Sequence, residues 1–313
     1  MIMKKMFFSL FCAACVVTAN AGEGALKGYF SVNSSGDKIA FSKGNLQYQA
    51  STNKWQFAEH QYDVLGTEAN NAISSTNAGW IDLFGWGTSG VSNKYPYMTS
   101  TTATDYGNGE NNIANTQYDW GSYDPIINGG NLAGKWRTLT KEEWQYMFED
   151  RMSALRLRGQ ATVNGIHGYV VLPDNFLEPT GITWTGNPNN WTDNTLTLEQ
   201  WGKMEDAGAV FLPVADHREG VVTYDGDYGY YWTSSYDASK KAYCIFFEGT
   251  SASITSDMRY RGQSVRLVQA YEAPTAITEI HSNKSQSQKV FRDGQLLIER
   301  DGKTYTVQGQ EVK

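Results

Sequence analysis

Cysteine and histidine are the side chains best suited to nucleophilic, redox or metal chemistry, and this sequence has three cysteines and four histidines. Cys12 and Cys15 have the CxxC spacing of redox and metal motifs. They lie in an apolar stretch near the N-terminus, however, where cysteine serves as a small hydrophobic residue. Cys244 stands in an apolar run, 242–247, and is predicted to be a buried structural thiol. A catalytic Cys244 would need a histidine partner, and nothing in the spacing provides one. The four histidines are His60, His167, His217 and His281.

No other motif singles out a reaction. The sequence has no HExxH pattern, no G-x-S-x-G elbow and no glycine-rich loop that opens a helix. Residues 216–219 (Asp-His-Arg-Glu) place charges side by side, but they follow Leu212-Pro213, where a loop tip is expected. We predict that this run is solvated, with a functional role as the alternative. The 33 acidic residues permit a carboxylate pair for hydrolysis, yet no pair stands out.

Short strands are the main elements predicted to position these residues. Apolar residues two apart predict strands between 28 and 66, at 169–172 and again from 209 to about 271. Two capping boxes predict helices, one opened by Thr140 and Glu143 and one near 196–207. Residues 67–135 are rich in Gly, Asn and Ser but hold eight anchoring aromatic side chains, so we expect an ordered loop region. The predicted fold class is α+β, with few helices, short antiparallel sheets and long ordered loops.

Both ends of the chain are predicted to be separate from the main domain. Lys4 and Lys5, an apolar stretch over 6–17 and an A-x-A site at 19–21 predict a signal peptide, 1–21, cleaved near Ala21. The protein is therefore expected to be secreted, surface-exposed or periplasmic, with no transmembrane segment after residue 21. Residues 22–271 form the expected main domain, and 272–289 a Ser- and Gln-rich linker. Two Asp-Gly turns predict a small β-meander over 290–313.

Composition excludes one class of partner. The chain has 313 residues, 26 basic and 33 acidic side chains, and a formal charge of −7, with no basic run. Such a chain has no positively charged surface for a phosphate backbone, so a nucleic-acid partner is not expected.

Four segments in order carry a resemblance to a known family. They are 136–144 (WRTLTKEEW), 172–174 (LPD), 210–215 (VFLPVA) and a last one from 229–235 (GYYWTSS) to 264–268 (SVRLV). Together they resemble the large paralogous domain family first noted in Fibrobacter succinogenes and widespread in Bacteroidetes. The resemblance implies a fold similar to the formylglycine-generating enzyme and, more distantly, to C-type lectins. Asp216-His217 departs from the family, whose members tend to carry Gly and an aromatic residue there.

The resemblance also implies which activity to test and which loops face a ligand. Formylglycine generation needs a copper-binding cysteine pair, whereas this chain keeps only Cys244 after the predicted signal peptide. That activity is therefore not expected, and Trp136, Trp144 and Trp232 of the shared framework are assigned to the core. In the lectin-like fold the loops between the late strands make the ligand-facing surface, and here these loops are 223–229 and the segment after the strand at 242–247 up to 260. We accordingly select seven candidate ligand-binding residues: Tyr224, Asp225, Asp227, Tyr228, Tyr236, Asp257 and Arg259.

Tyrosine offers a rigid apolar face with a polar tip, which suits sugars and protein surfaces. No cofactor is predicted. Asp225, Asp227 and Asp257 could supply oxygen ligands to calcium, by fold analogy alone. The alternative is that these Tyr-Gly-Asp loops are ordinary turns.

The tail over 290–313 resembles the C-terminal sorting domains that the type IX secretion system reads in exported Bacteroidetes proteins. It implies the bacterial secretion and sorting machinery as a partner. Our first functional hypothesis is an exported or cell-surface, non-enzymatic protein that binds a glycan or a protein. The alternatives are an enzyme on the formylglycine-generating scaffold with an unrecognised active site and a purely structural surface component.

Overall fold

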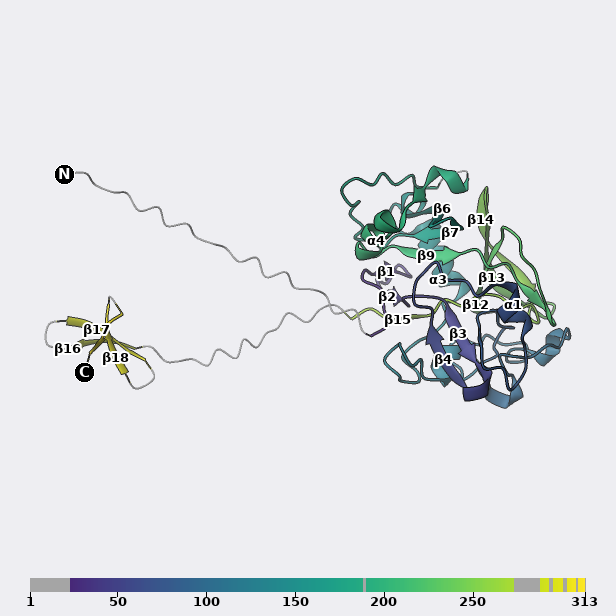
Figure 1. The fold of residues 1–313 in the computed structure, drawn as a ribbon, viewed down its shortest axis with the longest axis horizontal. Coiled ribbons are helices and arrows are strands. Elements are labelled where there is room, and N and C mark those ends of the chain that lie inside the picture. Colours follow the sequence, from purple (N-terminus) through teal and green to yellow (C-terminus); the bar gives the residue numbers. More distant parts are fainter. Residues whose placement is uncertain are drawn as a thin grey trace. The chain divides into compact units, whose positions relative to one another are not determined.

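The computed structural model describes residues 23–187, 190–272, 288–292, 295–300, 303–307 and 309–312. The chain divides into two compact units, Met1–Tyr271 and Glu272–Lys313 (Figure 1). The predicted signal peptide with Cys12 and Cys15, most of the predicted linker with His281, and both Asp-Gly turns lie outside the described residues.

The larger unit is a mixed α+β fold built from small, mostly antiparallel sheets (Figure 1). Its first sheet joins β1 (Phe30–Ser31), β2 (Lys38–Phe41) and β15 (Val268–Ala270), so the first and last strands of the unit share one sheet. A second sheet has the order β4-β3-β5, with β3 at Leu46–Gln49, β4 at Lys54–Phe57 and β5 at Trp80–Ile81.

Three further sheets complete this unit. One has the order β8-β6-β7-β9, from β6 (Arg158–Val163), β7 (Ile166–Val171), β8 (Thr195–Leu196) and β9 (Val210–Pro213). Only its short β6–β8 pair is parallel among the named strand pairs of the described residues. Another is the long meander β12 (Gly229–Asp237), β13 (Lys241–Glu248) and β14 (Ser251–Met258). The last is a two-stranded ribbon of β10 (Arg218–Glu219) and β11 (Val222–Thr223).

Helices are few and short in the described residues. They are α1 (Gly66–Asn71), α2 (Trp120–Tyr123), α3 (Lys141–Gln145), which continues as a π-helical turn over Tyr146–Asp150, and α4 (Leu198–Asp206). Both predicted capping boxes are confirmed: Thr140 accepts from the Glu143 amide, and Thr197 accepts from the Gln200 amide. None of the helices in the described part of the chain is long and apolar enough to span a membrane.

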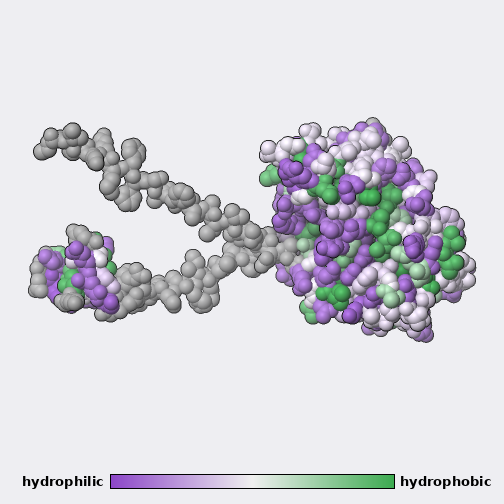
Figure 2. Space-filling model, viewed as in Figure 1, coloured by the Kyte–Doolittle hydropathy of each residue, from purple (hydrophilic) through white to green (hydrophobic). Residues whose placement is uncertain are grey.

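Buried aromatic side chains hold the unit together. Trp136, Trp144 and Trp232 are each about 1 % exposed, which confirms their assignment to the core. Trp144 packs in the cluster around Phe41 and Tyr169, whereas the other two belong to a neighbouring cluster. The surface drawn in Figure 2 mixes polar residues with small apolar groups.

The loop region over 67–135 is ordered, as predicted, because several of its aromatic residues enter the core. Phe84, Trp86, Tyr106 and Trp120 are almost fully buried. Tyr95, predicted to be an anchor as well, is instead 37 % exposed.

The structure corrects two expectations about the late strands. The segment up to 260, expected as a loop, contains the eight-residue strand β14, which pairs along its whole length with β13. This strand was not predicted because its residues are mostly small or polar and its outward face is not apolar. Within the predicted strand over 264–268, Ser264 makes a single bridge to Tyr231, 265–267 belong to no strand, and only β15 from Val268 onward forms a ladder.

The smaller unit is an antiparallel meander of four strands: β16 (Gln288–Arg292), β17 (Gln295–Arg300), β18 (Lys303–Thr306) and β19 (Glu311–Val312). Arg292 pairs with Gln295 and Arg300 with Lys303, which leaves two residues for each of the first two connections. These are the spacings of the predicted two-residue hairpins.

Candidate functional site

The connection between β11 and β12 carries most of the candidate residues, and the backbone holds it at both ends. The Tyr224 amide donates to the His217 carbonyl at 2.9 Å, and the Asp216 amide donates to the Tyr228 carbonyl at 2.8 Å. A β carbon on Gly226 would lie 2.6 Å from an oxygen of the Asp216 carboxylate. Glycine is therefore needed at this point, because the loop passes directly over that carboxylate.

Residues 216–219 contact this loop through Asp216 and His217. The prediction that these residues are solvated is wrong. Asp216 is 5 % exposed and Arg218 is fully buried. Arg218 donates to the carbonyls of Met98, Gly220 and Leu83, so its charge is satisfied by backbone oxygens. Burial lowers the pKa of Arg218 to about 10, which still leaves it protonated at neutral pH.

His217 connects residues 216–219 to the loop between β11 and β12. Its Nδ1 lies 2.6 Å from Asp216, and its ring stacks on that of Tyr224 with centroids 4.7 Å apart. Glu219 pairs with Arg261 at 2.7 Å, and Arg261 pairs in turn with Asp257 at 3.0 Å. Asp216 thus pairs with His217 and Glu219 with Arg261, while backbone carbonyls satisfy Arg218. The order of these residues in the sequence did not reveal these partners.

The loop forms one side of a pocket of about 430 Å³. Tyr224, Asp225 and Asp227 line it together with His167 of β7 and Asn70 of α1. His167 Nδ1 lies 2.9 Å from Asp227 Oδ1, and the His167 ring stacks on Trp191 with centroids 5.1 Å apart. Segments around residues 66, 167 and 225 therefore meet at one place.

The pocket is acidic and offers hydrogen-bonding groups. Its charged lining residues are Asp225 and Asp227, with His167 as the titratable base, and no Lys or Arg is among the described residues that line it. Tyr224, which lines the pocket, is 46 % exposed. Such a lining can receive hydroxyl groups or a cation, whereas a phosphate would face two carboxylates and no Lys or Arg of the described residues.

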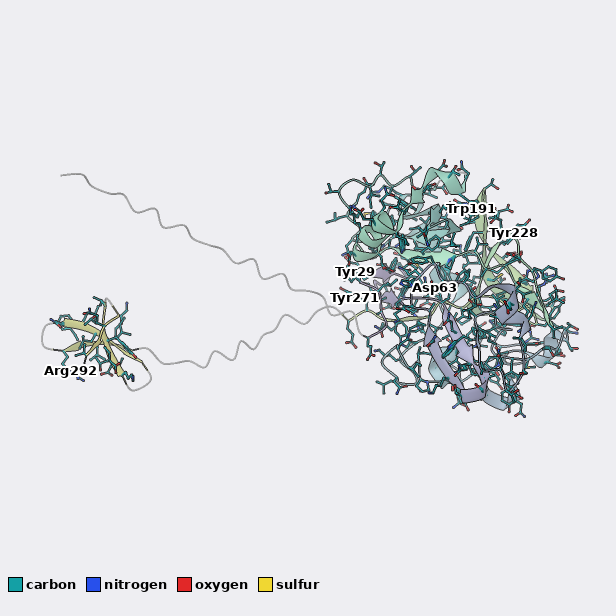
Figure 3. All side chains as sticks on the ribbon, in the orientation of Figure 1. Tyr29, Asp63, Trp191, Tyr228, Tyr271 and Arg292 are labelled. Atoms are coloured by element: carbon teal, nitrogen blue, oxygen red, sulfur yellow. The ribbon has the colours of Figure 1, made fainter. Side chains whose placement is uncertain are left out.

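Two further candidates, Tyr228 and Asp257, lie outside this pocket, and only Asp257 lines another hollow. Tyr228 does not line the 430 Å³ pocket; it stacks on Phe246, and it lies near the meander of β12–β14 (Figure 3). Asp257 lies in β14 instead of in a loop, is 9 % exposed, and lines a hollow of about 250 Å³ with Tyr230 and Arg261. Its carboxylate binds Arg261 and the Gln263 amide, so it is occupied in holding the structure.

The last two candidates pack away from both hollows. Arg259 is 2 % exposed, donates to the carbonyls of Gly109 and Lys240, and lies over the ring of Tyr236. Burial lowers the pKa of Arg259. The structure therefore brings together Tyr224, Asp225 and Asp227, and gives Tyr236, Asp257 and Arg259 packing contacts.

The three aspartates considered for calcium do not share one site. Asp225 and Asp227 line the larger pocket, whereas Asp257 lines the other hollow. Within the described ranges, no group of three or more His, Cys, Asp or Glu side chains is placed to hold a metal ion.

Cys244 is buried, as predicted, and carries no disulfide. It lies in β13, opposite Trp232, and burial strongly raises the pKa of its thiol. A thiol rather than a thiolate is a poor nucleophile and a poor metal ligand.

No protein-family model, no curated protein and no solved structure matches this chain.

His167, which lines the pocket, and Trp191, on which its ring stacks, were missed from the sequence. His167 was considered only as a partner for Cys244, and Trp191 was not considered at all. His167 follows the Asn164-Gly165 turn between β6 and β7, both of whose residues have positive φ. That dipeptide is a strong hairpin signal, so the position of His167 near the start of a strand could be predicted. Its approach to Asp227, sixty residues later, could not.

Proposed function

We propose that this protein is an exported or cell-surface, non-enzymatic protein that binds a glycan in the pocket beneath the loop between β11 and β12. We also propose that its larger unit belongs to the paralogous domain family described above, with a lectin-like fold related to the formylglycine-generating enzyme. The α+β architecture of short antiparallel sheets and long ordered loops supports this placement.

One observation carries the proposed function. Three side chains selected from the sequence as ligand-facing, Tyr224, Asp225 and Asp227, converge with His167 on a single pocket of about 430 Å³. Pockets of about 300–1,000 Å³ hold small ligands. Carboxylates accept hydrogen bonds from sugar hydroxyls, imidazole can accept or donate them, and a tyrosine ring can cover the apolar face of a sugar.

The burial of Cys244 and the raised pKa of its thiol favour a binding function over formylglycine generation. A single buried thiol whose pKa is raised cannot form the cysteine pair that the resemblance requires for copper. The pocket itself does not contain Cys244.

Glycan-array binding tests the proposal. We expect the chain without its predicted signal peptide, residues 22–313, to bind at least one glycan class, and to bind it equally in calcium and in EDTA. Calcium takes six to eight oxygen ligands, and two exposed aspartates supply too few of them. Loss of binding in EDTA would contradict the calcium-independent site, and absence of any glycan hit would contradict the glycan as ligand.

We further propose that the smaller unit directs export to the cell surface. Its four-stranded meander and the sequence resemblance of 290–313 to sorting domains support this role. Fractionation of producing cells tests it: a chain ending at residue 289 should be absent from the surface fraction, whereas an unchanged distribution would contradict the proposal.

A further inference from the structure

A third hollow, also of about 250 Å³, lies in the larger unit and contains none of the seven candidate residues. Four tyrosines line it: Tyr48 of β3, Tyr95 and Tyr97 of the following loop region, and Tyr123 at the end of α2. Tyr95 is 37 % and Tyr123 39 % exposed, so two of the rings are accessible to a ligand. This group of residues is called the tyrosine hollow below.

The rings of the tyrosine hollow are arranged in a row. Tyr95 stacks on Tyr97 with centroids 5.1 Å apart and planes 4° from parallel, and Tyr97 stacks on Tyr48 at 6.5 Å. Tyr48 is held by a hydrogen bond from its hydroxyl to Asn53 Oδ1 at 3.0 Å. Because the inner ring is almost fully buried, the row is fixed to the core at one end.

The backbone that carries Tyr95 is held in an uncommon conformation. Ser92 and Asn93 have φ values of 50° and 63°, and Gly90 has φ of 101°. A left-handed serine is unfavourable, and such residues persist where the surrounding structure demands them.

Asp124 is the one charged residue among the described residues of this lining. It makes no ion pair with any described residue, although it is only partly exposed. Burial raises the pKa of Asp124 to about 6, and the neighbouring Trp55 indole lowers it in part. At neutral pH the hollow thus combines a carboxylate that has no cationic partner among the described residues with the two exposed rings of Tyr95 and Tyr123.

We propose that the tyrosine hollow binds a small organic cation of the alkylammonium type, such as the trimethylammonium group of choline. Aromatic faces attract cations that are weakly hydrated, and quaternary ammonium groups are the ligands most often bound by clusters of aromatic side chains. The Asp124 carboxylate supplies the countercharge. A neutral sugar would use the rings but would leave this carboxylate without an opposite charge.

The size of the hollow agrees with a ligand of this kind. Drug-sized ligands occupy pockets of about 300–1,000 Å³. A volume of about 250 Å³ therefore suits a single compact headgroup or one side chain. The acidic charge of the whole chain, −7, also favours the approach of a cation.

Calorimetric titration of residues 22–313 with choline, and with its uncharged isostere 3,3-dimethylbutan-1-ol, tests the charge requirement. We expect a dissociation constant of about 1 mM or tighter for choline, which is within the range of titration. The isostere should bind at least about tenfold more weakly, because it has the same shape without the charge. Equal binding of the two compounds, or no binding of choline, would overturn the proposal.

Single substitutions test whether choline binds in the tyrosine hollow. Asp124→Asn and Tyr95→Ala should each weaken choline binding at least about tenfold, while Tyr224→Ala, an exposed tyrosine at the other pocket, should leave it unchanged. Tyr123→Ala provides a second exposed position if either first variant loses thermal stability. Loss of choline binding in Tyr224→Ala with retention in Tyr95→Ala would overturn the assignment.

Parallel titrations with trimethyllysine, lysine and a neutral hexose distinguish the source of the group. Binding of choline and trimethyllysine alike supports the trimethylammonium group as the recognised feature. Binding of the hexose without choline would overturn the proposal in favour of a sugar site. Because Tyr224→Ala affects only the pocket of the proposed function, failure of one proposal can be told from failure of the other.

Discussion

Replacing Trp232 by alanine is expected to lower the free energy of unfolding of the larger unit by about 3–5 kcal/mol. The indole is about 1 % exposed in β12, and its Nε1–H donates to the Phe84 carbonyl at 2.8 Å. Alanine would leave a cavity in the cluster that contains Trp86, and it would remove one of the two donors to the Phe84 carbonyl. This loss is a large fraction of the about 5–15 kcal/mol that stabilises a typical domain.

Urea unfolding of the full chain, followed by far-UV circular dichroism, measures this effect. Met152→Ala is the control, since Met152 is 90 % exposed and should change stability by no more than about 0.5 kcal/mol. Trp232→Phe should fall between the two, because the ring is largely kept while the hydrogen bond is lost. A decrease of less than about 1 kcal/mol for Trp232→Ala would contradict a central position for this side chain.

Asp119 is expected to make stability depend on pH between about 4 and 6. This side chain is fully buried and accepts hydrogen bonds from the amide and hydroxyl of Thr138. Burial raises the pKa of Asp119 from 3.8 to about 6, against the lowering effect of those bonds. The folded state therefore binds the proton more tightly than the unfolded state, and the proton stabilises the fold. This contribution is fully present below pH 3.8 and is lost as the pH rises through about 6.

Comparison with Asp119→Asn isolates the contribution of this group. A rise of about two pKa units corresponds to about 3 kcal/mol. The stability of the wild-type chain relative to the variant should therefore fall by about 2–3 kcal/mol between pH 4 and pH 7. The side chains of Asp82 and Asp124, whose pKa values are also raised, are present in both proteins, so their effects cancel. A difference independent of pH would show that the pKa of Asp119 is not raised.

Local features of the fold were open to prediction from the sequence. The two capping boxes depend on residues three apart, and both form at Thr140 and Thr197. The apolar run around Cys244 correctly indicated a buried strand, because alternation and burial are properties of neighbouring residues. Strand β14 was missed, since its small polar residues owe their conformation to pairing with β13.

The candidate site was predictable only in part. Tyr224, Asp225 and Asp227 are close in the chain, and a single loop brings them to one pocket. The approach of His167, and the burial of Asp216 and Arg218 among compensating partners, depend on contacts between distant segments. Asp257 and Arg259 resembled surface residues in sequence, but ion pairing and ring contacts hold them in the interior.

The central claim is that the pocket beneath the loop between β11 and β12 binds the ligand, and a pair of tyrosine variants tests it most directly. Tyr224 lines the pocket and Tyr228 does not, although the two are four residues apart and similarly exposed, at 46 % and 42 %. The affinity of each variant for the glycan selected on the array is the quantity to measure. The account predicts that Tyr224→Ala weakens binding at least about tenfold while Tyr228→Ala leaves it within about twofold of wild type. Equal losses, or a loss in Tyr228→Ala alone, would contradict it.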